Sequence, residues 1–116
     1  MQTEERWVGD LTILRLVGRL ELHEGDAVLR ASVNRLVADG RTQVLLDLSG
    51  ITRLDSAGLG MLVAKLLTAL RRGGTIKLLL PPPRALQLLD TTKLTSIFEI
   101  FHDEEEAIRS FGVLPS

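Results

Sequence analysis

The chain contains 116 residues, of which 45% are apolar, so it can bury one hydrophobic core, and we expect residues 1–116 to form a single domain. It has no cysteine, which excludes disulfide bonds, thiolate metal sites and cysteine nucleophiles. Its 14 basic and 15 acidic residues give a net charge of −1, and this balance argues against direct binding of nucleic acid or of an anionic membrane.

Two further features bear on where the protein works. The longest nearly apolar segment, residues 57–70, contains Lys65 and is shorter than the ~20 residues that a transmembrane helix needs. The N-terminal residues do not combine a basic segment with a following apolar one, as a secretory signal does. Together with the absence of cysteine, these features predict a cytoplasmic protein.

The N-terminal residues are expected to form a β-hairpin. Segments 6–8 and 11–17 are apolar or alternate between apolar and polar residues, as strands do. Gly9-Asp10 lies between them and is a two-residue hairpin signal. The sequence therefore predicts two antiparallel strands joined by a tight turn.

A first helix is expected over residues 26–39. Asp26 is suited to cap its N-terminus, and Gly40 is suited to end it. The apolar positions follow helical spacing, which predicts that they face the core. They are Leu29, Val33, Leu36 and Val37.

A buried strand and a long helix are expected next. Residues 44–48 form a nearly continuous apolar run, typical of a central strand covered on both faces. We expect residues 49–54 to form a connection. Ser56 is then suited to cap a helix that runs to about Arg72.

The next strand and helix are separated by three prolines. Residues 75–80 read as a short apolar strand, and residues 81–83 are prolines, which end strand pairing. A helix is expected from Pro83 to about Thr92. Its inward residues are expected to be Ala85, Leu86 and Leu89.

The C-terminal segment is expected to add a strand over residues 97–101 and a last helix capped by Asp103. The acidic run 104–106 falls in the first turn of that helix, where the helix dipole favours carboxylates, so we interpret it as structural rather than as a metal or partner site. The alternating order predicts an α/β fold with a mixed, mostly parallel sheet, an N-terminal hairpin and about four helices.

The most informative segment joins the central strand to the long helix. Ser56 lies at this junction and is followed by Ala57, Gly58 and Gly60. Glycine costs about 1 kcal/mol relative to alanine inside a helix, so a function is expected to justify these glycines. We interpret them as a bare surface for partner approach, and we expect Gly58→Ala to leave the helix equally stable or more stable.

Three other interpretations of this junction are possible. A nucleotide-binding turn is disfavoured because Val63 stands where a third glycine is required. A serine hydrolase is disfavoured because Leu54 replaces the first glycine of a nucleophile elbow and only His23 and His102 are available as bases. A simple N-cap role for Ser56 suits the position and is compatible with phosphorylation there.

Segments 44–52 and 54–60 together resemble the anti-sigma-factor antagonists of the STAS family, with the core motif Asp-Ser-x-Gly-Leu-Gly. The similarity spans nearly the whole chain, because residues 18–21 match the family's Gly-x-Leu-Asp element and residues 88–94 match the segment before its last strand. Two positions depart from the pattern. Glu21 stands where the family usually has Asp, and Lys93 where it often has Gly.

The resemblance implies a single STAS domain without catalytic residues, metal or cofactor of its own. It implies that the unphosphorylated chain binds an anti-sigma factor that is also a serine kinase, and that this kinase uses ATP to phosphorylate Ser56 while a phosphatase restores the binding form. Asp47 also matches a recurrent family position. The partner-binding residues expected are Glu21, Asp55, Ser56, Ala57, Gly58, Leu59 and Gly60.

The family also leaves a second role open. STAS domains similar to this one serve in stress-signalling scaffolds and as accessory subunits of lipid transporters, without a serine switch. The sequence does not identify the sigma factor, the kinase or the signal.

Overall fold

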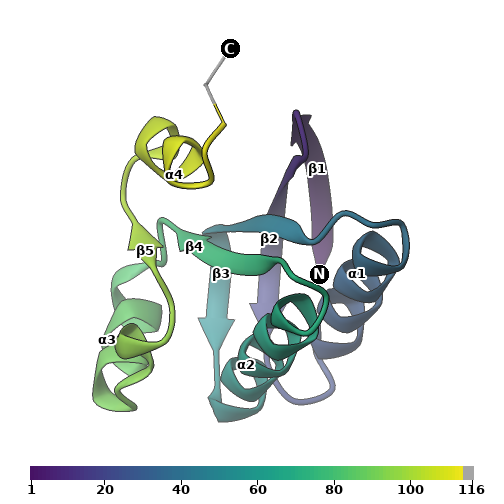
Figure 1. Ribbon diagram of the computed structural model, residues 1–116. Helices are drawn as coiled ribbons and strands as arrows, with labels where there is room; N and C mark the ends of the chain where they lie inside the picture. The colour runs from purple at the N-terminus through teal and green to yellow at the C-terminus, as the bar shows by residue number, and fades with distance from the viewer. Residues whose placement is uncertain (114–116) are drawn as a thin grey trace.

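A five-stranded sheet forms the centre of the computed structural model, which describes residues 1–113 (Figure 1). Its strands follow each other in space in the same order as in the chain. β1 is antiparallel to β2, and all the other neighbours are parallel, which confirms the mixed, mostly parallel sheet with an N-terminal hairpin. The strands are β1 (Gln2–Val8), β2 (Leu11–Leu20), β3 (Gln43–Leu54), β4 (Thr75–Leu79) and β5 (Ile100–Phe101).

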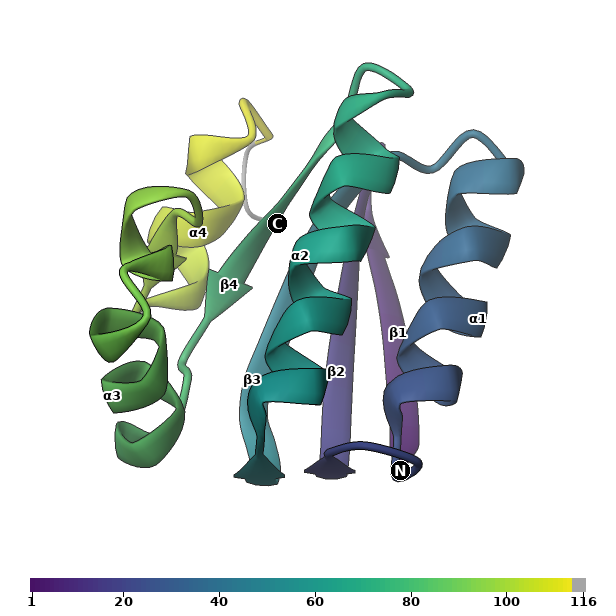
Figure 2. The same ribbon diagram turned by 90° about the horizontal axis from the view of Figure 1, so that it is seen from below.

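The helices lie on both sides of this sheet. α1 and α2 run side by side across one face, as Figure 2 shows. α4 packs against the opposite face, near β4 and β5. The helices are α1 (Asp26–Ala38), α2 (Ser56–Leu70), α3 (Pro83–Thr91) and α4 (Glu104–Ser110), with one 3₁₀ turn at Leu94–Ser96. Among residues 1–113, no helix has the length and apolar character needed to cross a bilayer.

The core is divided between these two faces. Val44 and Leu46 of β3 belong to the larger cluster beneath α1 and α2. Leu45, between them in sequence, belongs to a smaller cluster that Ala107 and Ile108 of α4 complete. β3 is therefore central and buried on both faces, as predicted from its continuous apolar run.

β3 is longer than the sequence predicted. Residues 49–54 were expected to be a connection, but they continue the strand and pair with β2 as far as Leu20 and Leu54. Two register irregularities in this pairing allow the extension. Gly50 lies at the irregular section, where an added Cβ would be 2.8 Å from the Leu16 carbonyl oxygen. The small residue thus permits a close strand contact that composition alone does not reveal.

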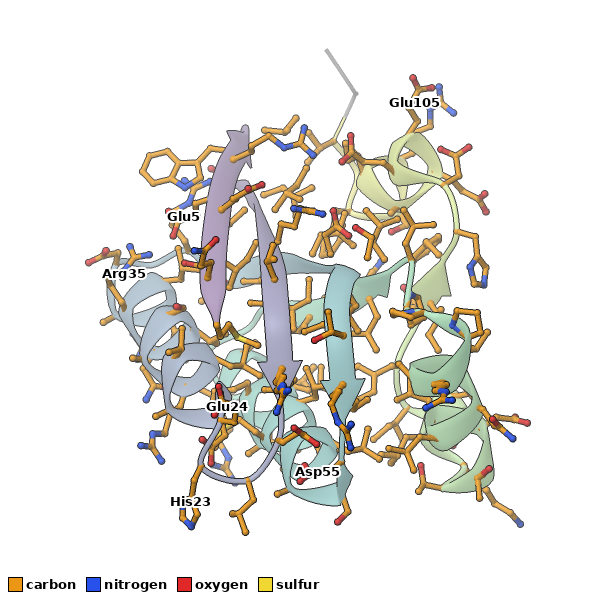
Figure 3. All side chains as sticks on the ribbon, turned by 180° about the vertical axis from the view of Figure 1, so that it is seen from behind. Glu5, His23, Glu24, Arg35, Asp55 and Glu105 are labelled. Atoms are coloured by element: carbon orange, nitrogen blue, oxygen red, sulfur yellow. The ribbon has the colours of Figure 1, made fainter. Side chains whose placement is uncertain are left out.

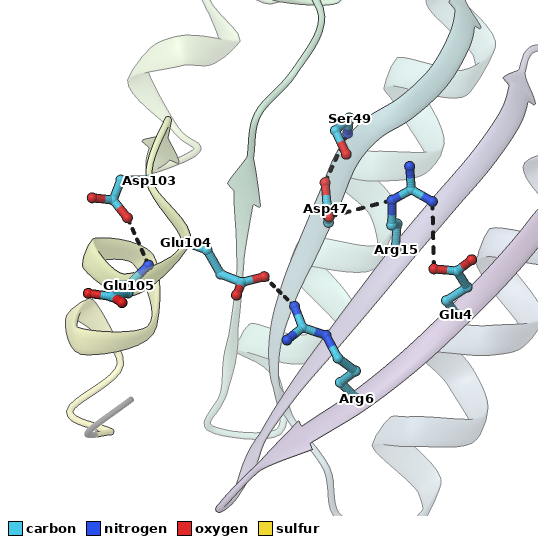
Figure 4. A network of polar contacts seen from close by, with 8 residues as sticks. All are labelled: Glu4, Arg6, Arg15, Asp47, Ser49, Asp103, Glu104 and Glu105. Atoms are coloured by element: carbon cyan, nitrogen blue, oxygen red, sulfur yellow. Dashed lines mark hydrogen bonds and ion pairs between the residues drawn. The ribbon is translucent and has the colours of Figure 1, made fainter. Parts of the chain in front are cut away.

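Asp47 consequently lies inside a strand rather than at its end. Its carboxylate accepts a hydrogen bond from the Ser49 backbone N–H at 3.0 Å and faces the Arg15 guanidinium, with 3.8 Å between Oδ2 and Nε. Arg15 also reaches Glu4 of β1, so charged side chains link β1, β2 and β3 on the face that α1 and α2 leave open (Figure 4). Asp47 therefore links neighbouring strands in addition to holding the backbone N–H of Ser49.

Several other boundaries differ from the predictions. β1 begins at Gln2 rather than at residue 6, because the polar residues pair with β2 as an exposed edge strand. Asp26 is the first residue of α1, and Gly25 occupies the N-cap position with a left-handed backbone. The last strand is only Ile100–Phe101, since the preceding residues include the 3₁₀ turn.

Other expectations for the helices are confirmed. Gly40 follows α1 with φ of 82°, and the four predicted apolar positions of α1 are buried. α3 begins at Pro83 and buries Ala85 and Leu89, whereas Leu86 is only half-buried.

The acidic run at residues 104–106 has the structural role that the sequence predicted. Asp103 caps α4 by accepting a hydrogen bond from the Glu105 N–H at 2.9 Å. Glu104 also forms an ion pair with Arg6 of β1, shown in Figure 4. The run therefore places α4 on the sheet.

Candidate functional site

Asp55 organises the junction between β3 and α2. Its Oδ1 accepts a hydrogen bond from the Gly58 N–H at 2.8 Å, and its Oδ2 accepts one from the Leu22 N–H at 3.0 Å. One carboxylate therefore caps α2 and holds the loop that follows β2. These backbone donors, with Leu22 the larger contributor and Gly58 the next, lower the pKa of Asp55. Figure 3 shows Asp55 at the same end of the sheet as His23 and Glu24.

Ser56 is not the helix cap that the sequence predicted. Asp55 occupies the N-cap with an extended backbone, and Ser56 is the first residue of α2. An ionised carboxylate that accepts two backbone N–H groups is a stronger acceptor than a hydroxyl, which accounts for the difference. Ser56 is exposed, and within residues 1–113 its hydroxyl has no hydrogen-bond partner. The hydroxyl is therefore accessible.

The two glycines of the motif have different environments. A Cβ added at Gly58 would lie 2.1 Å from the Leu20 carbonyl oxygen, so only glycine lets α2 approach the end of β2 this closely. The prediction that Gly58 serves only partner approach, and would tolerate alanine, is therefore wrong. Gly60 has no atom within 4 Å of the corresponding position and is exposed. A partner-facing role for Gly60 stays a prediction.

The loop after β2 is equally tight. Glu21 and Glu24 exchange two backbone hydrogen bonds, from Glu21 N at 2.8 Å and from Glu24 N at 2.9 Å. A Cβ at Gly25 would lie 2.1 Å from the Arg19 carbonyl oxygen. With the bond from Leu22 to Asp55, these contacts fix the loop against the start of α2.

Glu21 joins this site through an ion pair. Its Oε2 lies 3.2 Å from Nε of Arg53, near the end of β3. Glu21 and Asp55 line one cleft, so the structure brings these two predicted residues together. Sequence reasoning missed Arg53, although opposite charges at the ends of two neighbouring parallel strands were a usable signal.

The remaining predicted residues divide into surface and core. Ser56 and Gly60 are exposed and Ala57 is half-buried, so they can face a partner. Leu59 is 3% exposed and packs in the larger core cluster. Its assignment as a partner-binding residue is therefore wrong, because at this position of α2 the side chain points into the core.

The hydrolase and metal interpretations gain no support from this geometry. Across residues 1–113, neither histidine hydrogen-bonds to Ser56, and no group of three or more His, Cys, Asp or Glu side chains could hold a metal ion. His23 lies in the loop after β2 with a left-handed backbone, φ 62°, and is exposed.

The comparison with protein families decides the relationship. The family described as "Mlab, STAS domain" matches residues 3–99. The chain belongs to the STAS domain family. This confirms the resemblance inferred from the motif around Ser56, and the fold is the STAS fold, a single α/β domain with four helices.

Individual STAS relatives extend over nearly the full length. An anti-sigma F factor antagonist of Paenibacillus polymyxa is 25% identical over 114 residues, which are 98% of this chain and 97% of the relative. A crystal structure of a Thermotoga maritima protein, a candidate anti-sigma factor antagonist, gives a TM-score of 0.86 with 24% identity, over 93% of this chain and 92% of that one. The phosphorylated Bacillus cell fate determinant SpoIIAA gives 0.73 with 22% identity, over 95% and 99%.

One departure from the STAS pattern keeps the expected backbone. Lys93, where the family often has glycine, adopts φ of 62° in the turn before Leu94. Lys93 therefore keeps the left-handed conformation that glycine favours, although its side chain makes that conformation strained.

Proposed function

We propose that this STAS domain is an anti-sigma-factor antagonist switched by phosphorylation of Ser56. The observation that carries the proposal is the exposed Ser56 hydroxyl at the first position of α2, directly beside the capping carboxylate of Asp55. Two similarities support it: the Paenibacillus relative is an anti-sigma F factor antagonist, and the structures of similar fold include SpoIIAA in both its unphosphorylated and phosphorylated forms.

In this proposal the unphosphorylated chain binds an anti-sigma factor that is also a serine kinase and thereby releases the sigma factor. The kinase uses ATP as the phosphoryl donor for Ser56, and a phosphatase removes the phosphate again. The chain itself is a substrate in the cytoplasm, with no catalytic residue and no cofactor of its own.

The charge arrangement explains how a phosphate would switch binding off. Phosphorylation adds about −1.5 to −2 charges at pH 7. Asp55 already accepts the N–H of Gly58 in the first turn of α2, so the phosphate would share the helix N-terminus with a carboxylate. Water accommodates both charges in the free protein. In an interface, leaving such a charge desolvated costs roughly 2–5 kcal/mol, which corresponds to tens to thousands of fold in affinity.

The experiment is a titration of the cognate anti-sigma factor with wild type, the phosphoprotein, Ser56→Ala and Ser56→Glu. Ser56→Ala should bind the anti-sigma factor whether or not ATP is present, because it cannot be phosphorylated. Both the phosphoprotein and Ser56→Glu should bind weakly while their Tm stays within a few degrees of wild type. Ser96→Glu, at an exposed serine in the 3₁₀ turn, is the matched control and should bind normally. Equal affinity of phosphorylated and unmodified protein, or a phosphate located elsewhere by mass spectrometry, would refute the proposal.

A second candidate is a STAS scaffold or an accessory transporter subunit without a serine switch. The fold is also similar to part of the murine anion transporter Slc26a9, with a TM-score of 0.75 and 16% identity over 18% of that chain. Binding to a transporter component that is insensitive to Ser56→Glu would favour this candidate.

A further inference from the structure

A small cleft lies beside the Asp55 end of the site, with a volume of about 250 Å³. One wall is the end of β3, residues 51–55, and the other is the start of α3. Glu21 completes the lining. Pockets for small-molecule ligands commonly span about 300–1,000 Å³, so this cleft is closer to the size of one side chain than of a nucleotide.

Each wall of the cleft carries an arginine with unused donors. Arg53 uses Nε for its ion pair with Glu21, and among residues 1–113 its two terminal nitrogens make no hydrogen bond. Arg84 of α3 is exposed, and within the same residues its guanidinium has no ion-pair or hydrogen-bond partner. Free guanidinium N–H groups form a fork that matches a carboxylate.

The carboxylates in the lining are already engaged. Both oxygens of Asp55 accept backbone N–H groups, and Glu21 is paired with Arg53. The N-cap of α3 is Pro82, which provides no side-chain acceptor for the first turn. Although the formal charges of the lining balance, the groups left without partners are donors, so the cleft is complementary to an added negative charge.

We propose that this cleft receives an acidic side chain, Asp or Glu, of the anti-sigma factor when that protein covers Ser56. The inference rests on the proposed function, because it requires a protein partner at the Ser56 surface. Asp55 belongs both to the cleft and to the start of α2, so a partner seated on Ser56 lies next to the cleft. The contact would add a charge-assisted anchor that does not involve the serine.

The test measures affinity for the cognate anti-sigma factor by calorimetry at low and at physiological salt. Arg84→Gln should weaken binding about tenfold and reduce its salt dependence, and Arg84→Glu should weaken it about a hundredfold or more. Arg72→Gln is the matched control, because Arg72 is an exposed arginine just beyond the opposite end of α2. It should bind like wild type. When acidic residues of the anti-sigma factor are replaced by Lys one at a time, the change of the residue that enters the cleft should restore binding to Arg84→Glu.

The outcomes separate this inference from the proposed function. If Arg84→Glu binds like wild type while Ser56→Glu does not, the cleft is not a docking site although the switch stands. If the wild type binds no anti-sigma factor, both fail. A third possibility is that the cleft binds free anions. It is tested by titrating the protein with inorganic phosphate while the NMR chemical shift of the Ala85 amide is monitored. A shift that Arg84→Gln abolishes, together with unchanged partner affinity, would make the cleft a site for free anions and overturn the docking proposal.

Discussion

Gly58→Ala tests whether the motif glycine is required for folding. The added Cβ would lie 2.1 Å from the carbonyl oxygen of Leu20 and 2.8 Å from its carbonyl carbon. Both are backbone atoms at the end of a strand that pairs with β3, so they cannot rotate away as a side chain would. Relief requires α2 to shift from β2, which would disturb the hydrogen bond from Gly58 to Asp55.

Two opposing terms set the magnitude. Alanine gains about 1 kcal/mol over glycine in helix propensity. Overpacking a close contact costs about 1–3 kcal/mol, and a backbone contact this short belongs at the upper end or beyond. We expect the free energy of unfolding to fall by about 2 kcal/mol, which lowers the Tm of a domain of this size by roughly 8 °C.

Gly60→Ala is the matched control in the same helix, because no atom lies within 4 Å of its added Cβ. It should raise stability by up to about 1 kcal/mol. Urea and thermal unfolding monitored by circular dichroism measure both variants. A Gly58→Ala protein that melts at or above the wild-type temperature would refute the packing argument. If Gly60→Ala instead binds the anti-sigma factor more weakly than wild type while remaining stable, the bare surface at Gly60 serves the partner.

Substitutions at three further residues probe the site and the fold. Asp55→Ala should lower the free energy of unfolding at pH 7 by about 1–2 kcal/mol, because α2 loses its cap and Leu22 loses its acceptor. Because backbone N–H bonds lower the pKa of Asp55, the ionised carboxylate stabilises the fold above about pH 4, and this stabilisation is lost as the pH falls further. In urea titrations below about pH 4, the free energy of unfolding should therefore fall less steeply with decreasing pH in Asp55→Asn than in the wild type. Equal pH dependence of the two proteins would contradict this. Lys93→Val should lower stability by about 1 kcal/mol, since Lys93 has φ of 62° and a β-branched residue is strained there; an unchanged urea midpoint would count against it. Burial, and secondarily Arg30, lowers the pKa of Lys65, so the contribution of Lys65 to stability should rise as the pH approaches the ordinary lysine pKa of about 10.4. Urea titrations should show this rise in the wild type and not in Lys65→Met.

Local patterns were sufficient to predict most of the architecture. The continuous apolar run at residues 44–48 predicted a strand buried on both faces, and the spacing of Leu29 and Val33 predicted the inner face of α1. Gly9-Asp10 predicted the hairpin. These signals depend on residues close together in sequence, so they survive without knowledge of the tertiary structure.

The site contained details that local patterns could not settle. Asp55 and Ser56 are both good caps, and the choice between them depends on the Leu22 N–H, which is 33 residues away in sequence. The role of Gly58 depends on the carbonyl of Leu20 in another strand. The pairing of Arg53 with Glu21 likewise requires the register of β2 and β3. In these three cases, a contact between distant segments decided between two locally acceptable arrangements.

The coincidence of spatial and chain order in the sheet affects how the molecule assembles. Because each strand pairs with the one before it, every pairing step closes only the connection that has just been made. Each pairing step therefore has only the entropy cost of closing one connection, which favours rapid folding for a mostly parallel sheet. The ion pair between Arg6 and Glu104 spans 98 residues and joins the first strand to the last helix. It can form only after the whole sheet is in place, so it belongs to the final step of folding and its loss should speed unfolding rather than slow folding.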